Sequence, residues 1–176
     1  KFKKSFRRSA LLTLIDEVSS AVLSSRANVR MQQRITPTLN VSNSFILTYP
    51  SIIAVPSAKA IPTDADFIIK STSFLVDGQT CRIVNEQAPN VATNKLQIIA
   101  AGTGTILVDN IGSYSTTTGI INIVGFTPSG LLGGETFIKL SATPANQSAV
   151  VPERNNIIKF DPDASNFNAV ATEADY

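Results

Sequence analysis

The stretch that decides the fold is Ser73-Phe-Leu-Val-Asp-Gly-Gln-Thr-Cys-Arg-Ile-Val84, near the middle of the chain. Two short runs of apolar and β-branched residues flank the pair Asp77-Gly78. An Asp-Gly pair between two such runs is typical of a tight β-hairpin, because both turn residues then adopt positive φ. The sequence therefore predicts an antiparallel hairpin at this point.

Runs of the same character continue on both sides of this hairpin, separated by Pro, Gly, Asn and Asp. With the hairpin they give the following predicted strands: Phe45–Tyr49, Asp66–Lys70, Ser73–Val76, Cys81–Val84, Leu96–Ala100, Ile106–Val108, Gly119–Val124, Thr136–Leu140 and Asn156–Phe160. A second ribbon is expected from residues 106–124, with Gly112 and Gly119 marking its turning region. Pro50, Pro56 and Pro62 predict an extended connection or an edge strand.

The first part of the chain has a different pattern. Apolar residues recur there at intervals of three and four, Ser9 is available as a cap, and no Gly or Pro interrupts residues 1–36. We expect a helix that ends near Arg34, because Pro37 disfavours helical geometry in the residue before it. The predicted fold class is α+β, mainly β: an amphipathic helical element over residues 1–36, then an antiparallel-rich β-sandwich or mixed-sheet domain over residues 37–176.

Charge divides the chain at almost the same point. Residues 1–34 hold eight Lys/Arg and two Asp/Glu, a net charge of +6, whereas residues 35–176 hold seven and eleven, a net charge of −4. Arg26, Arg30 and Arg34 repeat every four residues, which would place them along one helix face. Because the acidic part of the chain would repel phosphate, we expect this basic face to contact protein rather than nucleic acid.

Composition argues against most catalytic and membrane classes. The chain of 176 residues has 43% hydrophobic and 16% charged residues, no His and a single Cys. Without His, the usual triad base and the commonest metal ligand are missing, and no apolar run is long enough for a membrane-spanning helix. We therefore expect neither an enzyme nor a membrane protein, and no cofactor, metal or small-molecule substrate.

Four patterns that could carry chemistry have plainer interpretations. Asp64 and Asp66 have the D-x-D form of cation-binding sites but lie at the entry to a strand, and Asp161-Pro162-Asp163 with Asn166 lacks the spacing of a calcium loop. Gly102-Thr103-Gly104 lacks the other residues of a phosphate loop and predicts a tight connection between strands. Cys81 lies in an apolar run and is expected to be a buried thiol.

The segment from Ile106 to Phe126 carries a resemblance, strongest at Gly112-Ser113-Tyr114 and at Thr118-Gly119 with the apolar run that follows. It is similar to the C-terminal part of the baseplate wedge proteins of T-even-type contractile-tailed bacteriophages, in the baseplate J-like group. The run from Val151 to Pro162 resembles the approach of such chains to their C-terminus. These proteins are much longer than this chain, and with its start at Lys1 this leads us to expect a part of a larger protein.

The resemblance implies a structural subunit whose copies pair and which joins neighbouring wedges into a ring around the tail hub. It implies a place in the virion, in the tail baseplate, with itself and other wedge proteins as partners and no catalytic residue. An alternative from another class is a carbohydrate-binding β-module of a phage tail or surface adhesin. The Ser/Thr/Asn-rich strands with Tyr49 and Tyr114 favour it, and the absence of Trp counts against it.

The helical element is our candidate for the contact between copies. If one of its apolar faces packs on the β-rich part, the side with Ala21, Ser24 and Ser25 is small enough to let another helix approach. We expect a two-fold homodimer formed through this helix or through the Pro-spaced segment. The candidate interface residues are Leu11, Leu12, Val22, Arg26, Arg30 and Arg34.

Overall fold

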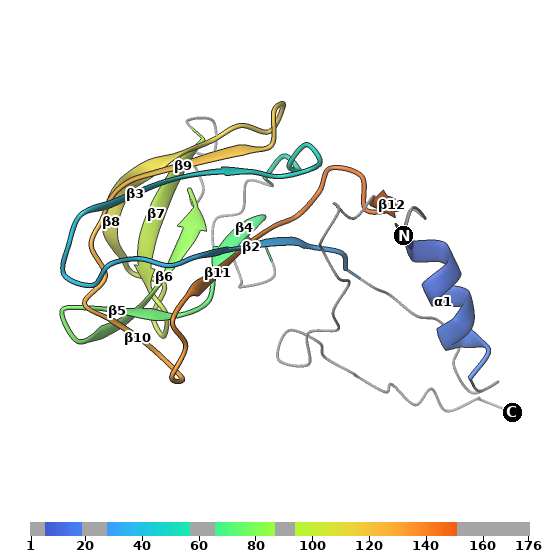
Figure 1. Cartoon of the computed structure of the whole chain (residues 1–176). Coiled ribbons are helices and arrows are strands. Elements are labelled where there is room, and N and C mark those ends of the chain that lie inside the picture. The colour runs from blue at the N-terminus through green and yellow to red at the C-terminus, as the bar shows by residue number, and fades with distance from the viewer. Residues whose placement is uncertain (1–5, 19–27, 57–65, 87–93, 151–176) are drawn as a thin grey trace, which may run out of the picture.

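The computed structural model describes residues 6–18, 28–56, 66–86 and 94–150 (Figure 1). This part of the chain has one helix and twelve strands. Their bounds are β1 Phe6–Arg7, α1 Arg8–Asp16, β2 Met31–Ile35, β3 Asn43–Thr48, β4 Ile69–Ser71, β5 Phe74–Val76, β6 Gln79–Asn85, β7 Lys95–Ala100, β8 Ile106–Tyr114, β9 Ile120–Phe126, β10 Gly130–Leu131, β11 Ile138–Ala142 and β12 Ala149–Val150.

Ten of these strands form one antiparallel sheet in the order β2-β11-β4-β6-β7-β8-β9-β3, with β5 beside β6 and β10 beside β5. The long strand β6 has two short neighbours on the same side, since it pairs with β5 at Gln79–Cys81 and with β4 at Val84. β10 and β11 follow the same division, because they pair with β5 and β4 respectively. Two neighbouring places in the strand order are therefore each filled by two short strands: β4 and β5 in one, and β11 and β10 in the next.

The two end strands of the sheet approach each other. The side chain of Gln33 in β2 donates from Nε2 to the carbonyl oxygen of Thr48 in β3, at 2.6 Å. Directly after β3, the Tyr49 hydroxyl donates to the carbonyl oxygen of Leu140 in β11, at 2.7 Å. Figure 1 shows the sheet curled around its core, with α1 standing away from it. The sheet is thus nearly closed on itself.

The core lies inside this curl and follows the alternation of the strands. In β11 every second residue is buried, as at Ile138 and Leu140, and β9 alternates in the same way as far as Val124, with Ile121 and Ile123 buried. The rings of Phe74 and Phe126 meet edge to face, with centroids 5.0 Å apart. Because Phe74 belongs to β5 and Phe126 to β9, this contact packs distant parts of the sheet order together.

The predicted hairpin is confirmed. Phe74 pairs with Cys81 and Val76 with Gln79, and Asp77 and Gly78 both have positive φ. The second ribbon is confirmed as β8 and β9, but Gly112 lies inside β8 rather than in the turn. The extended connection is also found from Pro50 to Pro56, where Ile53 bridges Pro144 just after β11. Pro62 lies outside the described residues.

The expected long helix is wrong in its length. Only α1 is helical in the described residues before the sheet, and Met31–Ile35 form the end strand β2. Met31 and Ile35 are both buried. Their spacing of four residues fits one face of a helix and also one face of a strand, so the pattern alone could not separate the two. The sheet therefore begins before residue 37, and residues 19–27 lie outside the described part.

The mainly β character and the antiparallel pairing are as expected, but a sandwich is not confirmed. One curled sheet encloses the core in the described residues, where a β-sandwich or a mixed-sheet domain was predicted. Strand candidate Asn156–Phe160 lies outside the described part of the chain.

Candidate functional site

The helix α1 carries an apolar stripe that no other part of the described residues buries. None of its residues is buried. Leu11, Leu14 and Ile15, with Val18 just after the helix, are spaced as i, i+3, i+4 and i+7, so they share one face. All four are exposed, Leu14 to 63% and Val18 to 82%. Packing of an apolar face of this helix on the sheet, which the sequence analysis considered as a condition, is not found in the described residues.

A short backbone connection attaches α1 to the end of the sheet region. Phe6 pairs with Val150 and Arg7 with Ala149, which makes β1 and β12 a separate two-stranded sheet. The amide of Arg8 also donates to the carbonyl oxygen of Ser148, at 3.3 Å. Figure 1 shows the helix projecting from this pair. The helix that carries the apolar stripe is therefore held at its N-terminal end by backbone hydrogen bonds to residues 148–150.

The charges on α1 lie at its two ends. Arg7 is the N-cap residue and Arg8 the first helical residue, while Asp16 ends the helix and Glu17 is its C-cap residue. The first turn contains no acidic residue and the last turn no basic one. The expected cap Ser9 lies inside the helix instead, where its carbonyl oxygen accepts a hydrogen bond from Thr13 Oγ1 at 3.1 Å. Arg7 provides no side-chain cap.

The structure separates the predicted interface residues. Leu11 and Leu12 lie on α1, exposed and half-buried respectively, whereas Val22 and Arg26 lie outside the described residues. Arg30 and Arg34 belong to the sheet region, so the predicted row of arginines along one helix face is wrong. Arg30 donates to the carbonyl oxygen of Phe67 and to Ser141 Oγ. It thereby ties the chain before β2 to β11 and to the segment before β4.

Arg34 lies on the exposed side of β2. Its guanidinium stacks over the ring of Phe137, 4.3 Å from the centroid. Lys139 approaches the same ring at 5.8 Å and pairs with Glu135 at 3.6 Å. These contacts hold the segment between β10 and β11 against the end of the sheet.

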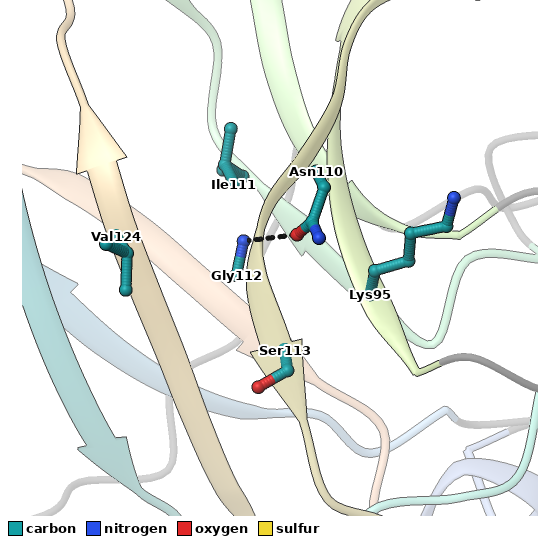
Figure 2. A pocket seen from close by; sticks show the side chains of 6 residues that line it. All are labelled: Lys95, Asn110, Ile111, Gly112, Ser113 and Val124. Carbon is teal, nitrogen blue, oxygen red and sulfur yellow. Dashed lines mark hydrogen bonds between the residues drawn. The ribbon is translucent and has the colours of Figure 1, made fainter.

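A second surface feature lies where β8 and β9 diverge (Figure 2). The two strands pair only from Gly112 to Tyr114, and the earlier part of β8 stays beside β7 while β9 continues along β3. The divergence leaves an open hollow of about 480 Å³. Its lining residues are Lys95, Asn110, Ile111, Gly112, Ser113 and Val124. Sequence analysis missed this feature, because the point at which two paired strands separate leaves no pattern along the chain.

A bulge in β8 builds the polar side of this hollow. From Val108 to Gly112, β8 uses four residue steps where β7 uses two, from Ile98 to Leu96. The Asn110 side chain accepts from the amide of Gly112 at 2.9 Å, as the dashed line in Figure 2 shows. The bulge also turns Asp109 towards β7.

Asp109 belongs to a compact group of charged and polar side chains. Lys95 Nζ lies 2.8 Å from Asp109 Oδ2 and 3.4 Å from Glu86 Oε1, and Gln97 Nε2 donates to Asp109 Oδ1 at 2.7 Å. The hydrogen bonds from Lys95 and then Gln97 hold the pKa of Asp109 below its usual value, and Asp109 in turn raises the pKa of Lys95. Glu86 is almost fully buried. The group therefore clamps the end of β6 to β7 and to the bulge of β8.

Tyr114 lies at the end of β8, where burial first and the charge of Glu86 second raise the pKa of its hydroxyl to about 12. Tyr49 is buried as well, and burial raises its pKa further. Exposed aromatic faces are what a carbohydrate platform needs. The two tyrosines that favoured carbohydrate binding therefore cannot supply such a platform.

The remaining sequence patterns have structural roles where they are described. Gly102–Gly104 lie in the connection between β7 and β8, as predicted, and Cys81 is fully buried, with burial raising the pKa of its thiol. Asp66 is half-buried before β4, while Asp64, Asp161 and Asp163 lie outside the described residues. Within the described ranges, no three His, Cys, Asp or Glu side chains gather as a metal site. No helix described here has the length and apolarity to cross a membrane.

Comparison with known proteins places the chain in no group. No protein-family model, no curated protein and no solved structure matches it.

Proposed function

We propose that this protein is a structural subunit of a phage tail baseplate wedge, which pairs with itself and joins neighbouring wedges into a ring around the tail hub. The observation that carries the self-association is the uncovered apolar stripe of α1. A nine-residue helix is marginal in water unless its apolar face is packed. The resemblance of residues 106–126 to wedge proteins supports the baseplate wedge as the particular assembly. It supports a structural role in the virion, not a catalytic one.

The protein's surface is consistent with this role in a second way. One group of charged side chains, Lys95, Glu86 and Asp109, braces the end of β6 against β7 and β8. The closure contacts of Gln33 and Tyr49 stiffen the sheet between its end strands. A subunit that transmits force needs a rigid body with a separate contact element, and α1 with the curled sheet has this arrangement.

The test is the mass of the purified chain in solution across a concentration series, by light scattering after size exclusion. We expect a monomer–dimer equilibrium, and we expect Leu14→Asp to shift it at least tenfold towards monomer because it places a charge in the centre of the stripe. Thr13→Asp is the matched control, since Thr13 is exposed on the side of the helix away from the stripe.

A chain that stays monomeric at every concentration and binds no other baseplate wedge protein would contradict the proposal. Equal effects of the two aspartate variants would show that the stripe is not the contact. For the wedge assignment itself, the readout is co-sedimentation of the chain with the other wedge proteins of a contractile-tailed phage.

A further inference from the structure

The charges of α1 are arranged against its own macrodipole. The N-terminal end of a helix is partly positive and its C-terminal end partly negative, so acidic residues are favourable at the start and basic residues at the end. α1 has the reverse: Arg7 and Arg8 at its start, Asp16 and Glu17 at its end. None of these four side chains makes an ion pair within the described part of the chain. The helix is thus destabilised by its own charges as an isolated element.

A second helix of the same sequence, running antiparallel, would reverse this effect at both ends. It would bring the acidic end with Asp16 and Glu17 beside Arg7 and Arg8 of the first copy, and the converse at the other end. The two dipoles would also oppose each other, which is favourable. A parallel arrangement would instead place arginine beside arginine and carboxylate beside carboxylate. The charge pattern therefore selects one orientation.

The apolar stripe between these charges has the same symmetry. Leu11 and Leu14 are separated by three residues near the centre of the helix, so an antiparallel partner can place Leu14 of the second copy against Leu11 of the first. The same contact then repeats on the other side of the two-fold axis. A surface that is complementary to itself in this way is what an isologous dimer requires.

We propose that α1 pairs antiparallel with α1 of a second copy of this chain, with the leucine stripe at the centre and opposite charges at both ends. This inference rests on the proposed self-association and names its surface and orientation. The contact is small. A helix of nine residues buries less than the roughly 1,200 Å² at the lower end of stable interfaces, so the isolated dimer is weak.

A weak pair is useful inside a ring. When neighbouring subunits are already held by other contacts, their helices are at high effective concentration and a small interface becomes occupied. The same weakness lets the pair separate when the assembly rearranges. The pairing therefore gives a reversible link between rigid sheets.

The test uses two charge-reversed variants, R7E/R8E and D16K/E17K, in the full chain. Each single reversal places like charges together in the antiparallel dimer. We therefore expect the dissociation constant of the dimer to rise at least tenfold for both variants. Each reversal also improves the fit of the helix to its own dipole. The helical signal in circular dichroism should therefore stay equal or increase while the dimer weakens, which separates pairing from helix stability.

Two further samples test whether opposite charges at the helix ends hold the two copies together. The combined variant with both reversals restores opposite charges in the antiparallel arrangement, and we expect it to dimerise like the original chain. An equimolar mixture of the two single reversals should form a heterodimer, because every contact between their ends is then complementary.

Other outcomes overturn the inference in distinguishable ways. If the original chain dimerises and neither reversal changes its affinity, a parallel helix pair or another surface forms the dimer, and the proposed function survives without this inference. If the combined variant stays monomeric, the pairing of opposite charges at the helix ends is wrong. If the original chain is monomeric at all concentrations, both this inference and the proposed self-association fail.

Discussion

Gly112 is the residue at which the backbone geometry of the sheet is most demanding. It has φ +147°, and a Cβ at this position would lie 2.0 Å from the carbonyl oxygen of Asn122 in β9. The close approach occurs at Gly112–Ile123, one of the three residue pairs that join β8 to β9 before the strands diverge. Only a residue without a side chain allows both the conformation and the distance.

We therefore expect Gly112→Ala to destabilise the protein by at least about 2 kcal/mol, through backbone strain and displacement of β9. The measurement is chemical denaturation followed by circular dichroism. Gly102→Ala is the control, because a Cβ there meets no atom within 4 Å and no positive φ is needed. We expect the control to change stability by less than about 0.5 kcal/mol. Similar values for the two variants would contradict this account.

Gly112 was recognised in the sequence as a glycine that shapes the backbone, but it was predicted to lie in a turn. Glycine marks turns and close approaches equally well, and the distance between two strands is not written in either strand alone. Asp77-Gly78, by contrast, was predicted correctly because the turn and both its flanking strands lie within one local stretch. Local geometry was thus predictable, and contacts between separate strands were not.

Among the elements, the interrupted strand formed by β4 and β5 shows how side chains replace missing backbone pairing. Ile83 of β6 pairs with Ile98 of β7 but has no strand partner on its other side, where β4 and β5 leave a gap. On that side its amide donates to Ser71 Oγ at 2.9 Å. The Ser71 hydroxyl in turn donates to the carbonyl oxygen of Thr72 at 2.8 Å, and Ser71 is buried. One hydroxyl therefore satisfies two backbone groups at this gap.

Ser71→Ala should leave the buried amide of Ile83 without a partner, at a cost of about 1–3 kcal/mol. The expected result in urea denaturation is a lower midpoint with an unchanged slope, because the surface exposed on unfolding stays the same. Ser44→Ala on the exposed side of β3 serves as the control and should be close to neutral. A neutral result for Ser71→Ala would mean that water or a neighbouring carbonyl already satisfies Ile83.

The element that sequence analysis misassigned is β2. Met31 and Ile35 face the core, but Gln32, Gln33 and Arg34 between them are polar, so no apolar run marks a strand. The pairing of β2 with β11, about a hundred residues later in the chain, decides its conformation. The apolar repeat of α1 is local and was recognised in the sequence, but of the candidate interface residues only Leu11 lies on the stripe. The positions of Arg30 and Arg34 could not be predicted, because they depend on the pairing of the sheet.

At the scale of the whole molecule, two buried tyrosines connect sheet closure to pH. Tyr49 joins the segment after β3 to β11 through its hydroxyl, and Tyr114 ends β8 beside the buried Glu86. Burial favours the neutral phenol, so both pKa values are raised in the folded protein. The unfolded chain has tyrosines near their ordinary value of about 10. Folding therefore gains stability from these groups below pH 10, and loses it as the pH rises through the folded values.

For Tyr114, whose folded pKa is about 12, this loss falls between pH 10 and 12. Tyr114→Phe removes that part of the pH dependence, so we expect its stability relative to the original chain to be higher at pH 11 than at pH 7. The Tyr114 hydroxyl makes no hydrogen bond within the described residues, so its removal should cost little stability at pH 7.

Tyr49→Phe is the informative comparison, because it also removes the hydrogen bond to Leu140 that helps close the sheet. It should cost about 1 kcal/mol at pH 7 and likewise reduce the loss above pH 10. Denaturant unfolding at pH 7 and pH 11 for the two variants and the original chain provides all the values needed. An unchanged stability between these pH values in the original chain would show that neither phenol is held neutral by burial, and that the sheet is open enough for water to reach both.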